Sequence, residues 1–166
     1  MFFNKSNKFK KFPIFFVFAL TLVIISTVLA ACSSDDSGGS ADVVKDSDLV
    51  IQSSEVTEVA KFYAVEIEGT KLEVIAVKAP DNTIRTAFNT CQVCFDSGRG
   101  YYVQEGDVLV CQNCGNRFKM SDVEVTRGGC NPVPITADEK TVTDTTITIS
   151  KEFLAQAKEI FANWKR

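Results

Sequence analysis

Residues 91–115 read CQVCFDSGRGYYVQEGDVLVCQNCG and hold two Cys-x-x-Cys pairs. Cys91 and Cys94 form the first pair, Cys111 and Cys114 form the second, and sixteen residues separate the two. A Cys-x-x-Cys turn directs two sulfurs at one point, and two such turns together supply the four thiolates of a tetrahedral metal site. The spacing therefore predicts a metal site made of these four cysteines.

The segment between the pairs is expected to fold as a β-hairpin. Residues 101–103 and 108–110 are rich in strand-forming residues, and they flank Gln-Glu-Gly-Asp at 104–107, which is typical of a turn. A hairpin brings its two ends together, so it would also bring the two cysteine pairs together. Gly115 follows Cys114 directly, as suits a tight turn whose backbone N–H groups approach the sulfur.

Two other interpretations of the paired cysteines stay open. In an oxidising compartment each pair would be able to form a disulfide, although a bridge within Cys-x-x-Cys closes only a tiny loop and stabilises little. A thioredoxin-like dithiol would need only one pair, and no βαβ pattern surrounds either one. The spacing also does not separate structural zinc from mononuclear iron or an iron–sulfur cluster.

A fifth cysteine, Cys130, follows the paired four. It lies in residues 127–134, RGGCNPVP, where two glycines and the prolines fix an unusual backbone. One interpretation is a further or alternative metal ligand, or a redox partner of the site. The other is a small buried side chain in a tight turn. Both stay open, because nothing in the chain pairs with Cys130 by spacing.

Histidine is absent from the chain, and its absence excludes several classes of function. The usual hydrolase triad, c-type haem attachment, Rieske centres and blue-copper sites all use imidazole. The acidic residues lie in no motif that singles out a catalytic acid–base pair. We therefore expect a metal carrier rather than an enzyme.

The N-terminus has the pattern of a bacterial lipoprotein signal. Residues 1–11 are polar and basic, residues 12–29 are mostly apolar, and Leu29-Ala30-Ala31-Cys32 follows. This ending resembles the lipobox, whose cysteine is lipidated and becomes the new N-terminus, so Cys32 is the expected lipidation site. A plain transmembrane anchor is the alternative, because about 20 apolar residues span a bilayer. Either interpretation makes the rest of the chain extracytoplasmic and membrane-anchored.

These signals divide the chain into a signal peptide over 1–31, a lipidated tether over 32–47 and one folded domain over 48–166. The Ser- and Gly-rich residues at 33–41 have nothing to bury, as in a flexible tether. Without the signal, fourteen basic and twenty-one acidic side chains remain, a net charge of −7. This balance argues against nucleic acid as a partner.

The folded domain is expected to be mostly β with a C-terminal helix, an α+β fold of small hairpin-based sheets with a four-cysteine metal-binding ribbon. Apolar residues alternate over 63–67, Gly69 turns the chain and residues 72–77 run back, which predicts a hairpin. Residues 146–149 form a further short alternating strand.

The C-terminal segment has a helical pattern with Ser150 in the position of an N-cap. Its apolar residues recur at helical spacing, and they are Phe153, Leu154, Ala157, Ile160, Phe161 and Trp164. We expect this helix to pack on the sheet, with a membrane-surface or partner-binding helix as the alternative.

Four segments together resemble a known bacterial family. They are AFNTCQVC at 87–94, GYY at 100–102, GDVLVCQNCG at 106–115 and GGCNPVP at 128–134. Over roughly residues 60–136 the chain is similar to the family labelled membrane iron–sulfur-containing FtrD-like.

The resemblance implies an iron–sulfur or other iron–thiolate site on the two cysteine pairs, with Cys130 as a further candidate ligand. It also implies an association with membrane systems for iron uptake or electron transfer.

Two hypotheses about function follow. The first is a surface-tethered protein that holds an iron–sulfur cluster or mononuclear iron and passes single electrons, with a membrane redox or iron-transport protein as its partner. The second is a lipoprotein domain in which zinc only stabilises the fold while the β-hairpins bind a protein partner, with no redox role.

Overall fold

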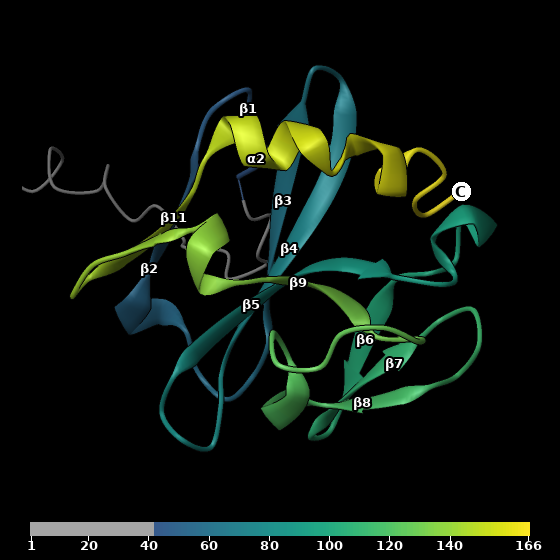
Figure 1. The fold of residues 1–166 in the computed structure, drawn as a ribbon, viewed down its shortest axis with the longest axis horizontal. Helices are drawn as coiled ribbons and strands as arrows, with labels where there is room; N and C mark the ends of the chain where they lie inside the picture. Colours follow the sequence, from purple (N-terminus) through teal and green to yellow (C-terminus); the bar gives the residue numbers. More distant parts are fainter. Residues whose placement is uncertain (1–41) are drawn as a thin grey trace, which may run out of the picture. The chain divides into compact units, whose positions relative to one another are not determined.

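A computed structural model describes residues 42–166 (Figure 1). The predicted signal peptide, the lipidation site Cys32 and most of the predicted tether lie outside these residues. Within the segment interpreted as tether, β1 (Val44–Lys45) pairs in parallel with β3. Strand pairing therefore starts at Val44, four residues before the expected domain start at Asp48.

The main sheet has five strands in the order β1-β3-β4-β5-β9. Apart from the parallel β1–β3 pair, its neighbours run antiparallel. The bounds are β3 Lys61–Ile67, β4 Thr70–Lys78, β5 Ile84–Cys91 and β9 Pro132–Ile135. Glu68 and Gly69 join β3 to β4 with φ values of 49° and 77°, as in the two-residue turns that match strand twist. The predicted hairpin over 63–77 is confirmed.

Two three-stranded sheets complete the β-structure. In the first, β11 lies between β10 and β2, and in the second, β7 lies between β6 and β8. The bounds are β2 Leu49–Gln52, β10 Thr141–Val142 and β11 Thr146–Ile149, then β6 Tyr102–Glu105, β7 Val108–Cys111 and β8 Arg117–Lys119. The hairpin expected between the cysteine pairs is β6–β7, and the strand expected at 146–149 is β11, so both predictions are confirmed.

Short 3₁₀ turns connect several strands. They are η1 Ser53–Glu55, η2 Phe95–Ser97, η3 Met120–Asp122 and η4 Ala137–Glu139, and η5 Lys158–Phe161 follows the C-terminal helix.

The C-terminal helix α2 (Lys151–Gln156) is shorter than its apolar pattern suggested. Ser150 caps it by accepting a hydrogen bond from the Phe153 N–H, as predicted. Beyond Ala157 the chain winds more tightly, with backbone bonds between residues three apart. This winding places Phe161 and Trp164 on the same side, where Phe161 packs in the core and the Trp164 indole N–H donates to a β5 carbonyl at 2.8 Å.

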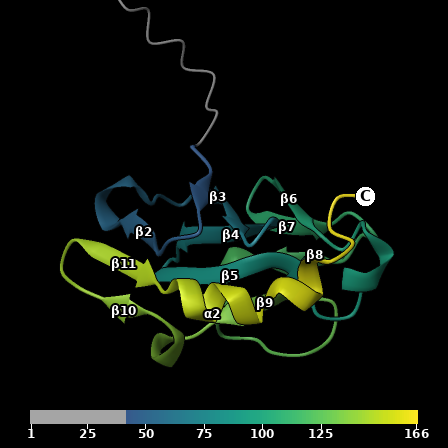
Figure 2. The same ribbon diagram turned by 90° about the horizontal axis from the view of Figure 1, so that it is seen from above.

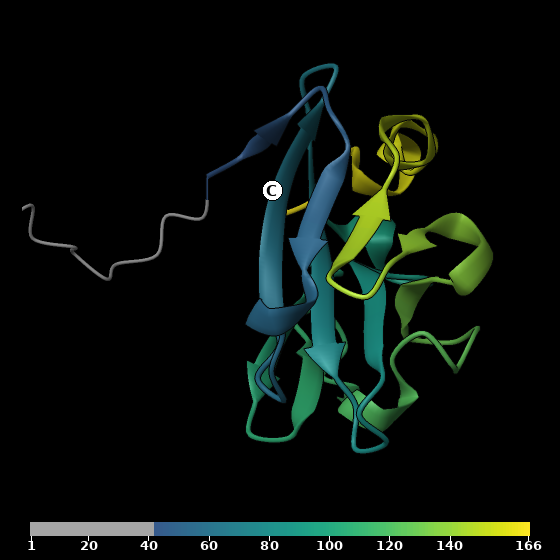
Figure 3. The same cartoon turned by 90° about the vertical axis from the view of Figure 1, so that its left-hand side faces the viewer.

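Strand β4 separates two apolar cores, because its successive side chains point to opposite faces. Val74 and Ala76 belong to the first core, which also contains side chains of β2, β11, α2 and η5. Ile75 and Val77 belong to the second core, which contains three of the five cysteines of the domain. Figure 2 shows α2 lying along the sheet, and Figure 3 shows the same helix end-on beside the strands. The β6–β8 sheet lies at the lower right of Figure 1. The fold is mostly β with one C-terminal helix, as predicted.

Candidate metal centre

The topology brings three cysteine-bearing segments together. Cys91 is the last residue of β5 and Cys111 is the last residue of β7, so each Cys-x-x-Cys turn begins where a strand ends. We call residues 91–94 the first cysteine turn and residues 111–114 the second cysteine turn. Cys91 pairs with Pro132 of β9, and this register places residues 127–131, called here the glycine loop, beside the first cysteine turn.

Both cysteine turns are tight and aim backbone N–H groups inward. In the first cysteine turn, the Cys94 N–H donates to the Cys91 sulfur at 3.3 Å. In the second, the Gly115 N–H donates to the Cys111 carbonyl at 2.9 Å, and Gly115 has φ of 73°, a value that favours glycine. The expectation that Gly115 closes a tight turn is confirmed.

The first cysteine turn packs closely against Gly100. A Cβ built on Gly100 would lie 2.4 Å from the Cys94 carbonyl oxygen, a distance that no side chain tolerates. The Gly100 carbonyl also accepts a hydrogen bond from the Cys91 N–H. Only glycine lets the chain pass here on its way to β6.

The five sulfurs form two overlapping groups of three. Cys91, Cys94 and Cys130 have sulfurs within 4.8 Å of one another, and so do Cys94, Cys111 and Cys114. Cys94 belongs to both groups, and its sulfur lies 3.9 Å from that of Cys130. All five cysteines are free thiols. Among residues 42–166, the four cysteines expected from the spacing are distributed over the two groups, and Cys130 joins Cys91 and Cys94 in the first.

The glycine loop is fastened to the first cysteine turn and to residues near the second. The Cys130 carbonyl accepts hydrogen bonds from the Tyr102 hydroxyl at 2.7 Å and from the Asn116 side chain at 2.8 Å. The Gln92 side chain accepts from the Gly128 N–H at 3.0 Å and donates to the Pro132 carbonyl at 3.2 Å. These contacts hold Cys130 between the first and the second cysteine turns.

The surroundings of the first cysteine turn set the acidity of its two thiols in opposite directions. Burial raises the pKa of Cys91, but hydrogen bonds from the Tyr102 hydroxyl and from the Val93 and Cys94 N–H groups outweigh it, so the Cys91 pKa is lowered. Burial raises the pKa of Cys94. Burial and the hydrogen bond to the sulfur likewise raise the pKa of the Tyr102 hydroxyl, which therefore stays a donor.

The pKa values of the remaining three thiols are also shifted in opposite directions. The Asn116 N–H lowers the pKa of the exposed Cys114. Burial raises the pKa of Cys111 to about 12, and the neighbouring sulfurs of Cys114 and Cys94 raise that of Cys130 to about 12. Cys91 and Cys114 are therefore the thiols that ionise most readily, one in each group of three.

The residues that support the centre were missed by the sequence reasoning. Tyr102, Gln92 and Asn116 hold the glycine loop, and buried Asn89 bonds the Tyr102 backbone at its N–H (2.7 Å) and its carbonyl (3.2 Å). Asn89, Gln92 and Tyr102 lie in the segments that carry the family resemblance, but nothing in those segments assigns them a supporting role.

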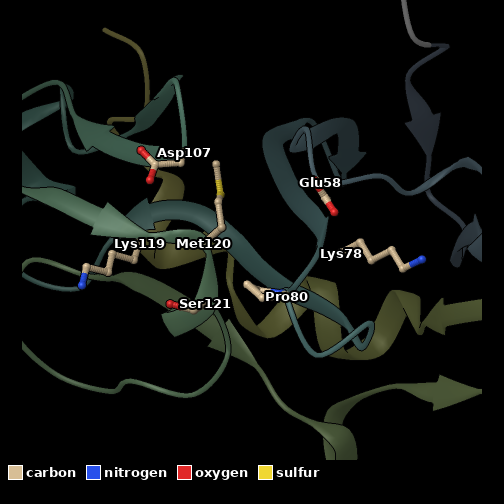
Figure 4. A pocket seen from close by; sticks show the side chains of 7 residues that line it. All are labelled: Glu58, Lys78, Pro80, Asp107, Lys119, Met120 and Ser121. Atoms are coloured by element: carbon tan, nitrogen blue, oxygen red, sulfur yellow. The ribbon is translucent and has the colours of Figure 1, made fainter.

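A separate cavity of about 330 Å³ contains no cysteine. Glu58 and Lys78 approach it from one side, and Asp107 and Lys119 from the other (Figure 4). Met120 also lines the cavity and belongs to the second core. The cavity shares no side chain with the centre.

The donor set suits a thiolate-bound metal centre, whether zinc, mononuclear iron or an iron–sulfur cluster. Both groups of three contain only cysteines, four of the five side chains are buried or half-buried, and backbone N–H groups point at the sulfurs. Thiolate donors, burial and N–H to sulfur hydrogen bonds are the features with which proteins hold such centres.

Comparison with known proteins points the same way. Residues 55–161 match the family described as membrane iron-sulfur containing protein FtrD-like, a range that includes all five cysteines of the centre. No curated protein and no solved structure matches the chain. Over residues 42–166, every helix is too short or too polar to cross a bilayer. The match covers most of the chain, which therefore belongs to the FtrD-like family of membrane iron–sulfur containing proteins.

Proposed function

We propose that this protein is an electron carrier that holds iron at its cysteine centre on the outer face of the cytoplasmic membrane. The observation that carries the proposal is the gathering of five free thiols into two groups within 4.8 Å, in a family described as iron–sulfur containing. Iron in such a centre supplies one-electron chemistry.

The protein's own groups would set the reduction potential. The Tyr102 hydroxyl and the Cys94 N–H direct positive dipole ends at the Cys91 sulfur. Such hydrogen bonds disperse the negative charge of a thiolate, and they favour the reduced, more negative state of a centre. Burial of Cys91 and Cys111 acts in the opposite direction, because a poorly solvated site resists added charge.

Cys114 gives the centre a route to the surface. Its side chain is exposed, whereas Cys91, Cys94 and Cys111 are buried. A carrier exchanges electrons where its centre comes closest to solvent, so the partner would dock over the second cysteine turn. We propose a membrane redox or iron-transport protein as that partner.

Anchoring by lipid at Cys32 fits this role. The Leu29-Ala30-Ala31-Cys32 ending predicts a lipid-bearing N-terminus, and the family description places these proteins at membranes. A tether that begins at Cys32 would keep the domain within reach of a membrane partner and leave the centre outside the cytoplasm.

The decisive experiment is metal and sulfide analysis of the full chain purified without oxygen, followed by a redox titration. We expect iron, visible absorption and a reversible one-electron change between about −700 and +450 mV. Cys114→Ser should lower the iron content and change the spectrum, while Val103→Ala, an exposed change on β6 outside both groups, should not. A colourless protein with bound zinc and no redox response would refute electron transfer and favour a zinc-stabilised domain that binds a partner.

A further inference from the structure

The five sulfurs of the centre gather in two overlapping groups of three. A metal–thiolate bond is about 2.3 Å long, so tetrahedral geometry places any two sulfurs on one metal about 3.8 Å apart. Four ligands of one metal would therefore all lie near one another. The described residues contain no such group of four: Cys91 and Cys111 never occur in the same group, and the sulfurs divide into two groups of three.

We propose that the centre has two metal positions that share Cys94 as a bridging thiolate. Cys91, Cys94 and Cys130 would hold the first metal, and Cys94, Cys111 and Cys114 would hold the second. The inference rests on the proposed function only in taking the cysteines as metal ligands, and it adds the number of metals and the role of each thiol. The distance of 3.9 Å between the Cys94 and Cys130 sulfurs is already that of two thiolates on one metal.

The contacts of the glycine loop support Cys130 as a ligand. A cysteine that only filled a turn would not need its carbonyl held from both sides, yet Tyr102 and Asn116 both donate to the Cys130 carbonyl. Gln92, inside the first cysteine turn, is bonded to the chain on either side of Cys130, at Gly128 in the loop and at Pro132 at the start of β9. The loop is thereby fixed in the position that the first metal requires.

Two metals that share Cys94 would use all five cysteines as ligands. Each metal then has three protein sulfurs, which leaves one position for a small non-protein ligand, and sulfide is that ligand in iron–sulfur centres.

Cobalt(II) is a suitable probe, because it takes tetrahedral thiolate sites and is coloured and paramagnetic. The full chain, purified in detergent without oxygen and stripped of metal, is titrated with Co²⁺. We expect saturation at about two Co²⁺ per chain, with loss of paramagnetism as the second ion binds, because a shared thiolate couples the two spins. Cys130→Ser and Cys114→Ser should each reduce the capacity to about one Co²⁺ and abolish the coupling. Val103→Ala is the matched control: it is exposed on β6 and lies outside both groups, so it should leave both readouts unchanged.

Alkylation of the wild-type protein gives a second readout that does not depend on a variant folding. With saturating Co²⁺, all five thiols of the centre should resist a thiol-alkylating reagent, Cys130 included. Saturation at one Co²⁺ with Cys130 still reactive would overturn the two-metal inference and leave the proposed function standing. Failure to bind Co²⁺ at all would overturn both.

Discussion

Removing the Tyr102 hydroxyl tests whether one side chain both supports the fold and tunes the centre. The ring is buried, its O–H donates to the Cys130 carbonyl at 2.7 Å, and the same hydroxyl lowers the pKa of the neighbouring Cys91 thiol. Tyr102→Phe keeps the ring and its packing and deletes only this donor. Asn116 still donates to the Cys130 carbonyl, so that oxygen is not left unpaired.

The structure allows the effect of Tyr102→Phe on the free energy of unfolding and on the reduction potential to be estimated. Loss of one neutral buried hydrogen bond costs about 1 kcal/mol of unfolding free energy, which lowers the melting temperature by about 3–5 °C in a domain of this size. A hydrogen bond to a charged sulfur is worth about 1.5–3 kcal/mol, and only a fraction of that, about 0.5–1 kcal/mol, differs between two redox states. For a one-electron couple this corresponds to a shift of about 20–45 mV, towards more negative potential, because the reduced centre loses more.

The assays are thermal denaturation followed by circular dichroism, and a potentiometric titration of the iron-loaded protein. Tyr101→Phe is the matched control, since Tyr101 directly precedes Tyr102 in the chain and its ring packs against Trp164. If Tyr102→Phe leaves both the melting temperature and the potential as they are in Tyr101→Phe, the assigned role of this hydroxyl is wrong.

Three further changes test separate parts of the structure. Gly100→Ala should destabilise the domain by several kcal/mol, because its Cβ would meet a backbone carbonyl at 2.4 Å. Gly69→Ala, whose Cβ has nothing within 4 Å, should cost only about 1–2 kcal/mol of left-handed backbone strain. Urea unfolding measures the free energy of unfolding of both variants. Lys140→Met should cost about 3–5 kcal/mol in the same assay, since it leaves Glu124 without its largely buried partner at 2.5 Å; a change below 1 kcal/mol would contradict this. Cys32→Ala should abolish lipid attachment and normal processing in cells, which mass spectrometry of the mature N-terminus detects; a wild-type N-terminus elsewhere, without lipid, would refute the lipoprotein interpretation.

Local patterns in the sequence predicted local structure well. Alternation of apolar residues identified the β3–β4 and β6–β7 hairpins, because a short turn sets the two strands that it joins side by side. The N-cap at Ser150 was also readable, since capping depends on residues adjacent in the chain. The tighter winding of the chain beyond Ala157 was not readable from the sequence, because it depends on contacts of Phe161 and Trp164 with distant β5.

Pairings between distant segments were beyond the same reasoning. Alternation shows that a segment is a strand but not which strand it joins, so the partnership of β2 with β11 had no local signal. The position of Cys130 could not be predicted for the same reason, because it depends on the pairing of distant strands. Its approach to the first cysteine turn follows from the pairing of β5 with β9, which sets Cys91 opposite Pro132. Spacing along the chain therefore identified the two cysteine pairs and left the fifth cysteine undecided.

A single buried amide explains how two different sheets present their cysteines to one another. The register of β5 against β9 shifts between Phe88 and Cys91, and Asn89 lies inside this irregular stretch. Its side chain bonds the N–H and the carbonyl of Tyr102, as a neighbouring strand would, and so joins the main sheet to β6. Tyr102 in turn pairs with Cys111 across the β6–β7 hairpin. The distance between the two cysteine turns is thus fixed through rigid, buried structure, as a metal centre with a defined geometry requires.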